Sequence, residues 1–172
     1  QSFETMVKCA KSLKKINIID WIVVGDGRWK KELESSVKLN NLENNFQLIN
    51  SVPLNKINKY FNCADALYLS LKNNKTFKKT IPGKLQTYMS TGKPIIASIS
   101  GEAKKIINKA KCGFVSNAEN HKLLKKNIIN FAKLNYKQRK KLGMNGKKFS
   151  NIFFSKKKII KNLENEIKLM LN

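Results

Sequence analysis

Three short segments contain residues whose types and spacing suit phosphate or nucleotide binding. The first is Gly25-Asp26-Gly27, directly after an apolar run that predicts a strand. Ligands of open α/β sheets bind beyond the carboxyl ends of strands, and glycine there allows a tight turn and a close ligand approach. Lys30 stands where a GxGxxG motif has its third glycine, so an ordinary structural turn is the alternative interpretation.

The second segment, Asn50 to Pro53, follows the short apolar run 46–49. Backbone groups of Ser51 and the apolar side chain of Val52 suit a flat ring such as a nucleotide base. A plain turn between a strand and a helix is the alternative, and the residues alone do not separate the two.

The third segment, Thr80 to Lys84, opens a predicted helix with Pro82 near its first turn. Backbone amides at a helix amino end are unpaired and carry partial positive charge, which favours phosphate. Gly83 lets a ligand approach the backbone, and Lys84 adds a full charge. An ordinary helix start with a solvated lysine is the alternative.

Other common chemistries lack their residues. His121 is the only histidine, and the eleven acidic residues include no DxD pair, so neither a histidine-based triad nor a metal cluster is indicated. No Walker motif occurs. The scattered cysteines fit neither a disulfide framework nor a zinc site, and they favour a reducing compartment: Cys9, Cys63 and Cys112. We therefore predict no metal and no cofactor, and no catalytic residue can be named.

The elements that position these segments alternate between strand and helix. The predicted strands are 18–25, 46–49, 65–71, 93–98 and 112–116. The predicted helices are 3–15, 29–39, 54–64, 82–92, 101–111, 119–134, 136–150 and 155–171. Alternation at this spacing predicts an α/β fold, a parallel sheet with helices on both faces. The run 18–25 reads as a strand buried on both faces, and the polar segment 72–79 as an exposed loop.

The composition indicates one globular domain with a strongly basic surface. The 172 residues are 41% apolar and carry a formal charge of +24. All but Arg28 and Arg139 of the 35 basic residues are lysine, and readers of bases favour arginine. A solvated lysine surface is one interpretation, and a surface for anionic lipid or nucleic acid is the other. No apolar run reaches the length of about 18 residues that spans a membrane.

The order of several motifs resembles the carboxyl-terminal half of a family 4 glycosyltransferase with the GT-B fold. The matching segments are IVVGDGRWKKELE, FQLINSVPLNKINKYFNCADALYLSL and TIPGKLQTYMSTGKPIIASISGEAKKIINKAKCGFV. The piece PGKLQTYMSTGKPIIAS is the most specific, and it is similar to the N-acetyl-L-fucosamine transferases of O-antigen and capsule synthesis. The resemblance covers nearly the whole chain and implies a Rossmann-like domain.

The resemblance implies a retaining hexosyltransferase that binds a UDP-linked sugar without a metal. By position, Ser51 and Val52 flank the nucleotide base. Gly83 and Lys84 meet the diphosphate. Gln86 and its neighbour fall where many members hold the ribose.

Two positions depart from the family pattern. Thr87 stands where many members have a ribose-binding glutamate, and a hydroxyl cannot match the two acceptor bonds of a carboxylate. Lys79, next to Thr80, stands where a second glutamate approaches the donor sugar. We interpret Gln86-Thr87 as a variant ribose site and Lys79-Thr80 as a contact to the donor sugar or the phosphate.

The resemblance also implies a larger protein. We expect residues 1–172 to be one nucleotide-sugar-binding domain without its first strand, with carboxyl-terminal helices over about 136–171. The acceptor, a lipid-linked glycan, is expected to bind an amino-terminal domain outside this sequence. Such an enzyme works in the cytoplasm, at the inner, anionic face of the bacterial plasma membrane, in O-antigen, capsule or lipopolysaccharide synthesis.

The alternative function is a non-catalytic, basic binding module for nucleic acid or another anionic partner. Such a module interleaves exposed aromatic and basic residues on one face. The aromatic residues Tyr60, Phe61, Tyr88 and Phe114 fall at predicted core positions instead. This pattern favours the enzyme and makes nucleic acid an unlikely partner.

Overall fold

The computed structural model describes the backbone of residues 2–171, and all their side chains except those of residues 157 and 162. The strands are β1 (Trp21–Val24), β2 (Phe46–Ile49), β3 (Leu67–Ser70), β4 (Ile95–Ser98) and β5 (Gly113–Ser116). The helices are α1 (Phe3–Leu13), α2 (Lys30–Leu39), α3 (Leu54–Cys63), α4 (Lys75–Lys79), α5 (Gly83–Thr91), α6 (Glu102–Ala110), α7 (His121–Ala132), α8 (Tyr136–Phe153) and α9 (Lys156–Leu171), with a 3₁₀ turn at Glu43–Asn45. This order confirms the predicted alternation of strands and helices.

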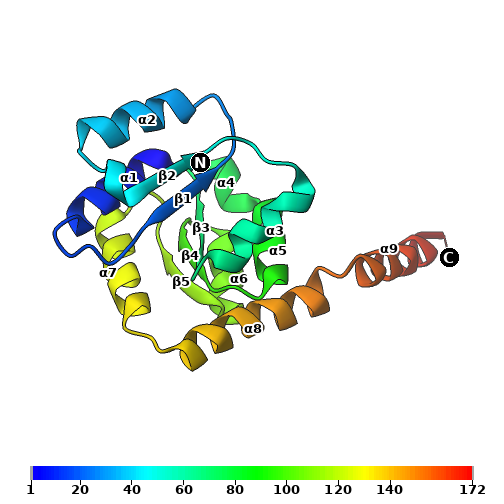
Figure 1. The fold of residues 1–172 in the computed structure, drawn as a ribbon. Coiled ribbons are helices and arrows are strands. Elements are labelled where there is room, and N and C mark those ends of the chain that lie inside the picture. Colours follow the sequence, from blue (N-terminus) through cyan, green and yellow to red (C-terminus); the bar gives the residue numbers. More distant parts are fainter. Residues whose placement is uncertain (1, 172) are drawn as a thin grey trace.

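The strands form two parallel sheets rather than the single predicted sheet. Strand β1 pairs with β2, with Trp21 opposite Phe46. Strands β3, β4 and β5 form the other sheet in that order, with Leu67 opposite Ile95 and Ile95 opposite Gly113. All five described strands are thus paired in parallel, but β1 and β3 do not pair with each other (Figure 1).

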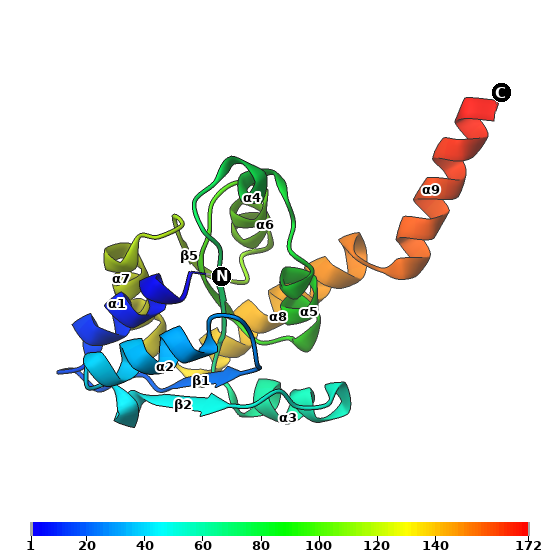
Figure 2. The same cartoon turned by 90° about the horizontal axis from the view of Figure 1, so that it is seen from above.

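Helices cover both faces of the strands, as predicted. Helix α1 packs against α2 and α7, and α7 lies on β4 and β5. On the opposite face, α5 contacts β3, α6 contacts β5, and α8 packs along α5 and α6 (Figure 2). The fold is therefore α/β with a Rossmann-like layering.

Strand β4 divides the core because its side chains alternate between the two faces. Ile96 belongs to the apolar cluster under α1, α2 and α7. Ile95 and Ala97 belong to the second cluster, together with Leu85 and Met89 of α5. All of these side chains are buried, so β4 holds both helical layers in place.

Three local predictions were wrong. Segment 72–79 contains the short helix α4, because Asn74 accepts a hydrogen bond from the amide of Phe77 as an amino-terminal cap. Strand β1 is buried on one side only, and Ile22 is 41% exposed. Tyr60 and Phe61 of α3, predicted as core residues, are only half-buried, because α3 has no buried residue.

Helix α8 lies very close to the end of α5. Gly92 ends α5 in a left-handed conformation with φ of 75°, as its position after the helix predicts. A Cβ atom on Gly143 of α8 would lie 1.8 Å from the carbonyl oxygen of Gly92. Only glycine at position 143 allows this backbone approach.

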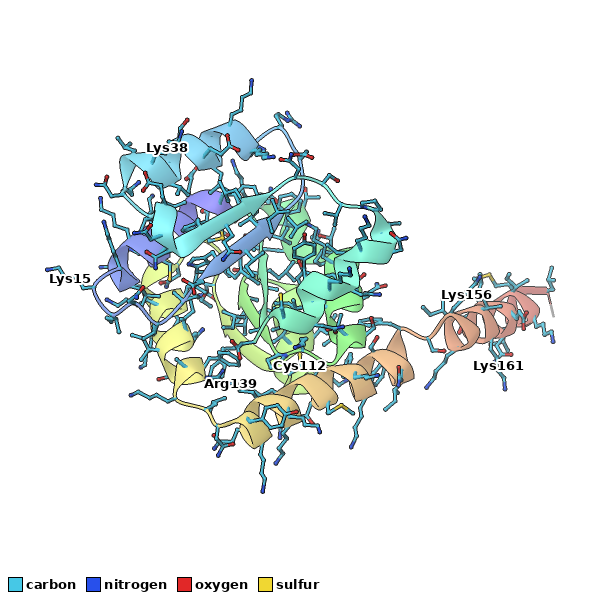
Figure 3. The ribbon with its side chains drawn as sticks, in the orientation of Figure 1. Lys15, Lys38, Cys112, Arg139, Lys156 and Lys161 are labelled. Atoms are coloured by element: carbon cyan, nitrogen blue, oxygen red, sulfur yellow. The ribbon has the colours of Figure 1, made fainter. Side chains whose placement is uncertain are left out.

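The described lysines lie mainly on the outside, and few have acidic partners. Figure 3 shows Lys15, Lys38, Lys156 and Lys161 pointing away from the body of the protein. Within the part of the chain that the structure describes, three ion pairs form: Lys30–Asp26, Lys105–Glu102 and Arg139–Asp65. Helix α9 projects from the body, and none of the described helices is long and apolar enough to cross a membrane.

Candidate nucleotide-binding site

The loops that follow β1 and β2 are joined through the carboxylate of Asp26. One carboxylate oxygen accepts a hydrogen bond from the backbone amide of Ser51 at 2.6 Å. The other accepts from the ammonium of Lys30 at 2.7 Å, and Lys30 also bonds the side-chain oxygen of Asn50. The two segments singled out in the sequence therefore form one unit at the carboxyl ends of their strands.

These contacts also set the charge of the unit. The hydrogen bond from Lys30, followed by that from the Ser51 amide, lowers the pKa of the Asp26 carboxyl below its ordinary value. Asp26 is therefore ionised at neutral pH. It neutralises Lys30, so that lysine is not a free cation for phosphate.

The glycines of the first loop leave space around the backbone. Gly25 has φ of 137°, a conformation that residues with a side chain rarely adopt. A Cβ atom on either Gly25 or Gly27 would meet nothing within 4 Å. In the neighbouring loop Ser51 is exposed and Val52 is half-buried. The ends of β1 and β2 thus present open backbone beside an apolar side chain.

The amino end of α5 presents unpaired backbone amides. The residue that caps this end is Pro82, whose side chain makes no hydrogen bond to the helix. The first hydrogen bond within the helix runs from the Leu85 amide to the Pro82 carbonyl at 2.8 Å. The amides of Gly83 and Lys84 precede that bond and have no helical acceptor. A Cβ atom on Gly83 would meet nothing within 4 Å, so a ligand can reach this backbone.

Some side chains of α5 already have contacts within the protein. Lys84 lines a large cavity together with Phe61 and Tyr88, and desolvation there lowers the pKa of its ammonium. The rings of Phe61 and Tyr88 meet edge to face at 5.8 Å between centres. Thr87 donates its hydroxyl to the Gly83 carbonyl at 3.3 Å, while Gln86 is half-buried. Thr87 therefore keeps only its acceptor lone pairs for a ligand.

Lys79 and Thr80 lie at the end of α4, beside the start of α6. Lys79 is exposed, and Thr80 donates its hydroxyl to the carbonyl of Phe77 at 3.3 Å. A Cβ atom on Gly101 would lie 1.9 Å from the carbonyl oxygen of Lys78, so α4 rests directly on the cap of α6. Lys79 thus has a fixed backbone and a free charge.

The structure brings the predicted residues together in two groups. The first contains the loops after β1 and β2, and the second the amino end of α5. Among the described residues, no hydrogen bond or ion pair joins the two groups. The predicted core aromatic residues are half-buried rather than buried, and three of them line the large cavity: Tyr60, Phe61 and Tyr88.

Comparison with known proteins identifies the chain. Residues 1–149 match the family described as glycosyl transferases group 1. The chain belongs to this family. No curated protein matches it.

Solved structures agree with this group 1 assignment at the level of the fold. HepE (Alr3699) of Anabaena in complex with UDP has a TM-score of 0.78 at 16% identity, over 96% of this chain and 44% of that one. A sucrose-phosphate synthase from Thermosynechococcus elongatus has a TM-score of 0.80 at 16% identity, over 99% of this chain and 42% of that one. WaaG, a glycosyltransferase involved in lipopolysaccharide biosynthesis, has a TM-score of 0.70 at 15% identity, over 88% of this chain and 39% of that one. The chain therefore spans less than half the length of these structures, and the Rossmann-like GT-B fold class is confirmed.

Sequence reasoning missed the role of Asp26 in this glycosyl transferase domain. A short acidic side chain between two glycines, with a lysine four positions later, was the available signal. The local pattern by itself indicates only an interrupted glycine motif. Asp26 is the residue that fixes the two loops to each other.

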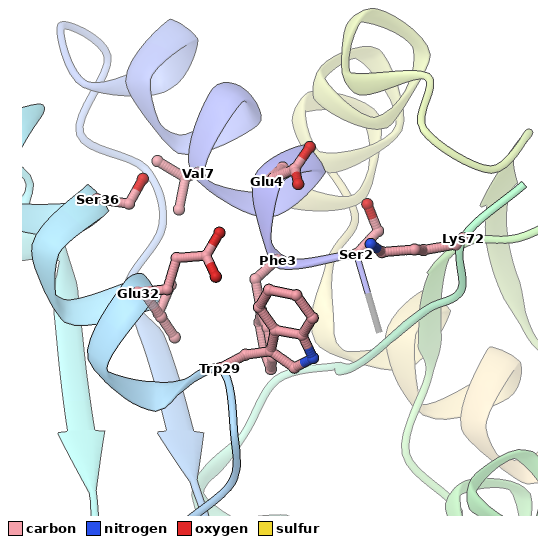
Figure 4. Close-up of a pocket in the computed structure, with 9 residues that line it drawn as sticks. Ser2, Phe3, Glu4, Val7, Trp29, Glu32, Ser36 and Lys72 are labelled. Atoms are coloured by element: carbon pink, nitrogen blue, oxygen red, sulfur yellow. The ribbon is translucent and has the colours of Figure 1, made fainter.

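A small pocket of about 50 Å³ lies between α1 and α2 of the domain. Figure 4 shows the Trp29 ring beside Phe3, with Lys72 reaching toward it. The Lys72 ammonium lies 5.2 Å from the centre of the Trp29 ring, a cation–π contact. This pocket is too small for a nucleotide. No group of three or more histidine, cysteine, aspartate or glutamate side chains suited to a metal was found within residues 2–171.

Proposed function

We propose that the chain is the donor-binding half of a retaining hexosyltransferase that uses a UDP-linked sugar. The single observation that carries the proposal is the open amino end of α5, where the Gly83 and Lys84 amides are unpaired and accessible. A diphosphate is the group that such a helix end binds well. Membership of the group 1 glycosyl transferases makes a nucleotide sugar the natural source of that diphosphate.

The proposed base site is the unit held by Asp26. Ser51 and Val52 would flank the uracil ring, and the open backbone of Gly25 and Gly27 would let the nucleotide pass close to the first loop. The UDP complex of HepE, which shares this fold, supports UDP as the nucleotide. A metal-free reaction remains part of the proposal.

The proposed roles of residues on α5 and α4 follow from the hydrogen-bonding groups and charges that their side chains still have available for a ligand. Gln86 would contact the ribose, with Thr87 limited to accepting a bond because its hydroxyl donates to Gly83. Lys84 would add charge to the diphosphate site. Lys79 and Thr80 would approach the donor sugar or its phosphate, and the charge of Lys79 opposes that of a phosphate.

The proposal for the acceptor and for the cellular setting concerns a longer protein of which this chain is one domain. We propose a lipid-linked glycan acceptor held by an amino-terminal domain, in bacterial surface polysaccharide synthesis at the cytoplasmic side of the plasma membrane. The fold likeness to WaaG and the basic surface, which suits anionic lipid, support this setting.

Calorimetric titration with UDP, uridine and a short DNA duplex tests the proposed function. UDP should bind more tightly than uridine, because uridine lacks the groups that the α5 amides would hold. Equal affinity of UDP and uridine would remove the phosphate role. Tighter binding of the duplex than of UDP, with a steep dependence on salt, would favour the binding module instead.

A further inference from the structure

Helix α9 carries an apolar face that the rest of residues 2–171 leaves exposed. Four apolar residues recur at intervals of three and four positions, which places them on one face of the helix: Ile160, Leu163, Ile167 and Met170. Their side chains are between 44% and 82% exposed. The main contact of α9 is α8, and the helix projects from the body of the protein (Figure 1). Amphipathic helices gain most of their stability by burying the apolar face, so α9 calls for a partner.

The last turn of α8 adds exposed apolar side chains just before α9. Ile152 and Phe153 are 49% and 48% exposed. The ring of Phe149 packs against Phe153 at 4.4 Å between ring centres and against Phe154 at 5.9 Å. Exposed apolar groups therefore follow one another along the chain from the aromatic cluster at the end of α8 to the end of α9.

The junction between α8 and α9 is also strongly basic. Residues 147–161 contain six lysines and no acidic residue, so this short segment holds a quarter of the net charge of +24. The ion pairs among the described residues lie elsewhere in the domain. Glu164 and Glu166 follow in the second half of α9, where five lysines and two glutamates leave the helix with a net charge of +3. The positive charge is therefore concentrated at the amino end of the apolar face.

Two lysines lie directly beside the exposed apolar groups. The ammonium of Lys109, on α6, is 5.5 Å from the centre of the Phe153 ring, and that of Lys158 is 5.9 Å from the same centre. Lysine packs its aliphatic stem along an apolar surface while its ammonium stays at the polar side. The same surface thus presents apolar side chains and cations next to each other.

This combination of apolar and cationic groups favours one class of partner. Nucleic acid would attract the lysines but offers nothing to the aliphatic face of α9. A second copy would cover the aliphatic face, but that face spans only about two heptads, and two chains of charge +24 repel each other. The boundary of an anionic bilayer offers acyl chains to the apolar face and negative headgroups to the lysines.

We propose that α9 and the last turn of α8 form a docking surface for an anionic lipid bilayer. Helix α9 lies in the plane of the interface, with Phe153 and the apolar face of α9 at the acyl boundary and the lysines at the headgroups. With 16 residues and five lysines, α9 lies on the bilayer and does not span it. The inference rests on the proposed membrane setting and deepens it, because it names the element that makes the contact. Most of this surface lies after residue 149, where the match to the group 1 family ends.

Co-sedimentation of residues 1–172 with lipid vesicles tests the charge of the docking surface. Vesicles of phosphatidylcholine alone are compared with mixtures of phosphatidylcholine and anionic phosphatidylglycerol, and the chain should bind the anionic vesicles at least about 10-fold more tightly. Lys156→Glu/Lys161→Glu should weaken this binding by about 10- to 100-fold. The matched control is Lys14→Glu/Lys15→Glu, which changes the net charge equally at the exposed end of α1, on the opposite side of the molecule (Figure 3). Its effect should not exceed about threefold, because salt screens distant charges.

A second pair of variants tests the apolar face. Ile160→Ser/Ile167→Ser should weaken binding to the anionic vesicles by about 10-fold or more, because two side chains lose their burial at the acyl boundary. Leu39→Ser/Leu54→Ser is the matched control, since both leucines are at least 85% exposed and lie on α2 and α3. It should leave vesicle binding unchanged. Lipids brominated in the acyl chain should quench the added fluorescence of Leu163→Trp and leave that of the parent chain, with Trp21 and Trp29, unchanged.

Several results would overturn the proposal. They are no binding to anionic vesicles, equal binding to both kinds of vesicle, and equal losses in the two lysine variants. A dimer in light scattering that Ile160→Ser/Ile167→Ser dissociates would assign the apolar face of α9 to a second copy and also overturn it.

Calorimetry with UDP separates this inference from the proposed function. Each variant of the docking surface should bind UDP as the parent chain does, because α9 lies apart from the amino end of α5 (Figure 2). UDP binding without vesicle binding would refute the docking surface alone. Vesicle binding without UDP binding would refute the donor-binding function alone.

Discussion

The Asp26 carboxylate accepts a hydrogen bond from the backbone amide of Ser51 at 2.6 Å, and this bond fixes the loop after β1 to the loop after β2. The two residues are distant in sequence, and the contact depends on the parallel pairing that brings the ends of both strands to one edge. The ionised form of Asp26 is the form that makes this contact with full strength.

The loop unit should open in acid. The folded pKa of Asp26 is lowered, so its contribution to stability is present above the ordinary carboxyl value of about 4 and is lost as the pH falls through the folded pKa. The NMR shift of the Ser51 amide should titrate with a midpoint below that ordinary value. In the control Asp26→Asn this transition should vanish, and a midpoint above the ordinary value would contradict the assignment.

Lys84→Ala should weaken UDP binding by about 10- to 100-fold, because a charge-assisted hydrogen bond is worth about 1.5–3 kcal/mol. The free energy of unfolding should change little, since Lys84 makes no ion pair in the described structure. Calorimetry measures the affinity, with Lys31→Ala on exposed α2 as the control. An unchanged dissociation constant would show that the amides of α5 act without this lysine.

Gly83→Ala should separate ligand affinity from stability. The added methyl group meets nothing in the free domain, and alanine favours a helix, so unfolding should cost the same or about 0.5–1 kcal/mol more. The methyl group would obstruct a bound diphosphate, and UDP affinity should fall by about 1–3 kcal/mol. Ser90→Ala, on the last turn of α5, should leave UDP affinity unchanged. Full UDP affinity of Gly83→Ala would place the diphosphate elsewhere.

Gly143→Ala should destabilise the domain although position 143 is remote from the site. Its methyl group would lie 1.8 Å from the Gly92 carbonyl oxygen, so α8 must move away from α5. Overpacking of this kind costs about 1–3 kcal/mol, which lowers Tm by roughly 2–12 °C for a domain of this size. Gly146→Ala is the matched control, because its nearest contact is 3.1 Å to Cys112 Cβ. Equal losses in both variants would refute the argument.

Binding and turnover should separate in residues 1–172. The chain spans less than half the length of HepE, the sucrose-phosphate synthase and WaaG, and transfer requires donor and acceptor to be held together. UDP should therefore bind without measurable sugar transfer to polyprenyl-diphosphate-linked acceptors from a panel of UDP-sugars. Turnover comparable to that of a full-length group 1 enzyme would place the acceptor site within this chain.

Sequence patterns predicted most helices and strands because the residues within each segment determine where it begins and ends. The strand 46–49 was predicted with its observed bounds, and Gly92 ends α5 as its position indicates. Helix α4 was missed because its cap is a single asparagine in a polar run, which is also typical of a loop. The exposed side of β1 was missed because an apolar run does not reveal whether a neighbouring strand covers it.

The geometry of the candidate site was predictable where the local backbone decides it and unpredictable where tertiary contacts decide it. The sequence indicated an open amino end of α5, because Pro82 and Gly83 determine it locally. The bond between Asp26 and Ser51 depends on the pairing of β1 with β2, which no local pattern specifies. The position of the Lys84 side chain in a cavity wall depends on α3 packing beside α5, which is equally non-local.

Because lysine residues far outnumber their acidic partners, added salt should raise the stability of this protein and weaken its attraction for an anionic ligand. With 35 basic and 11 acidic residues, like charges repel across the folded surface. Added salt screens that repulsion over a Debye length of about 10 Å at 0.1 M and should raise the free energy of unfolding. The same screening would weaken the proposed attraction of a diphosphate to α5 and Lys84. A buffer chosen for the highest melting temperature would therefore be among the least sensitive for detecting the nucleotide.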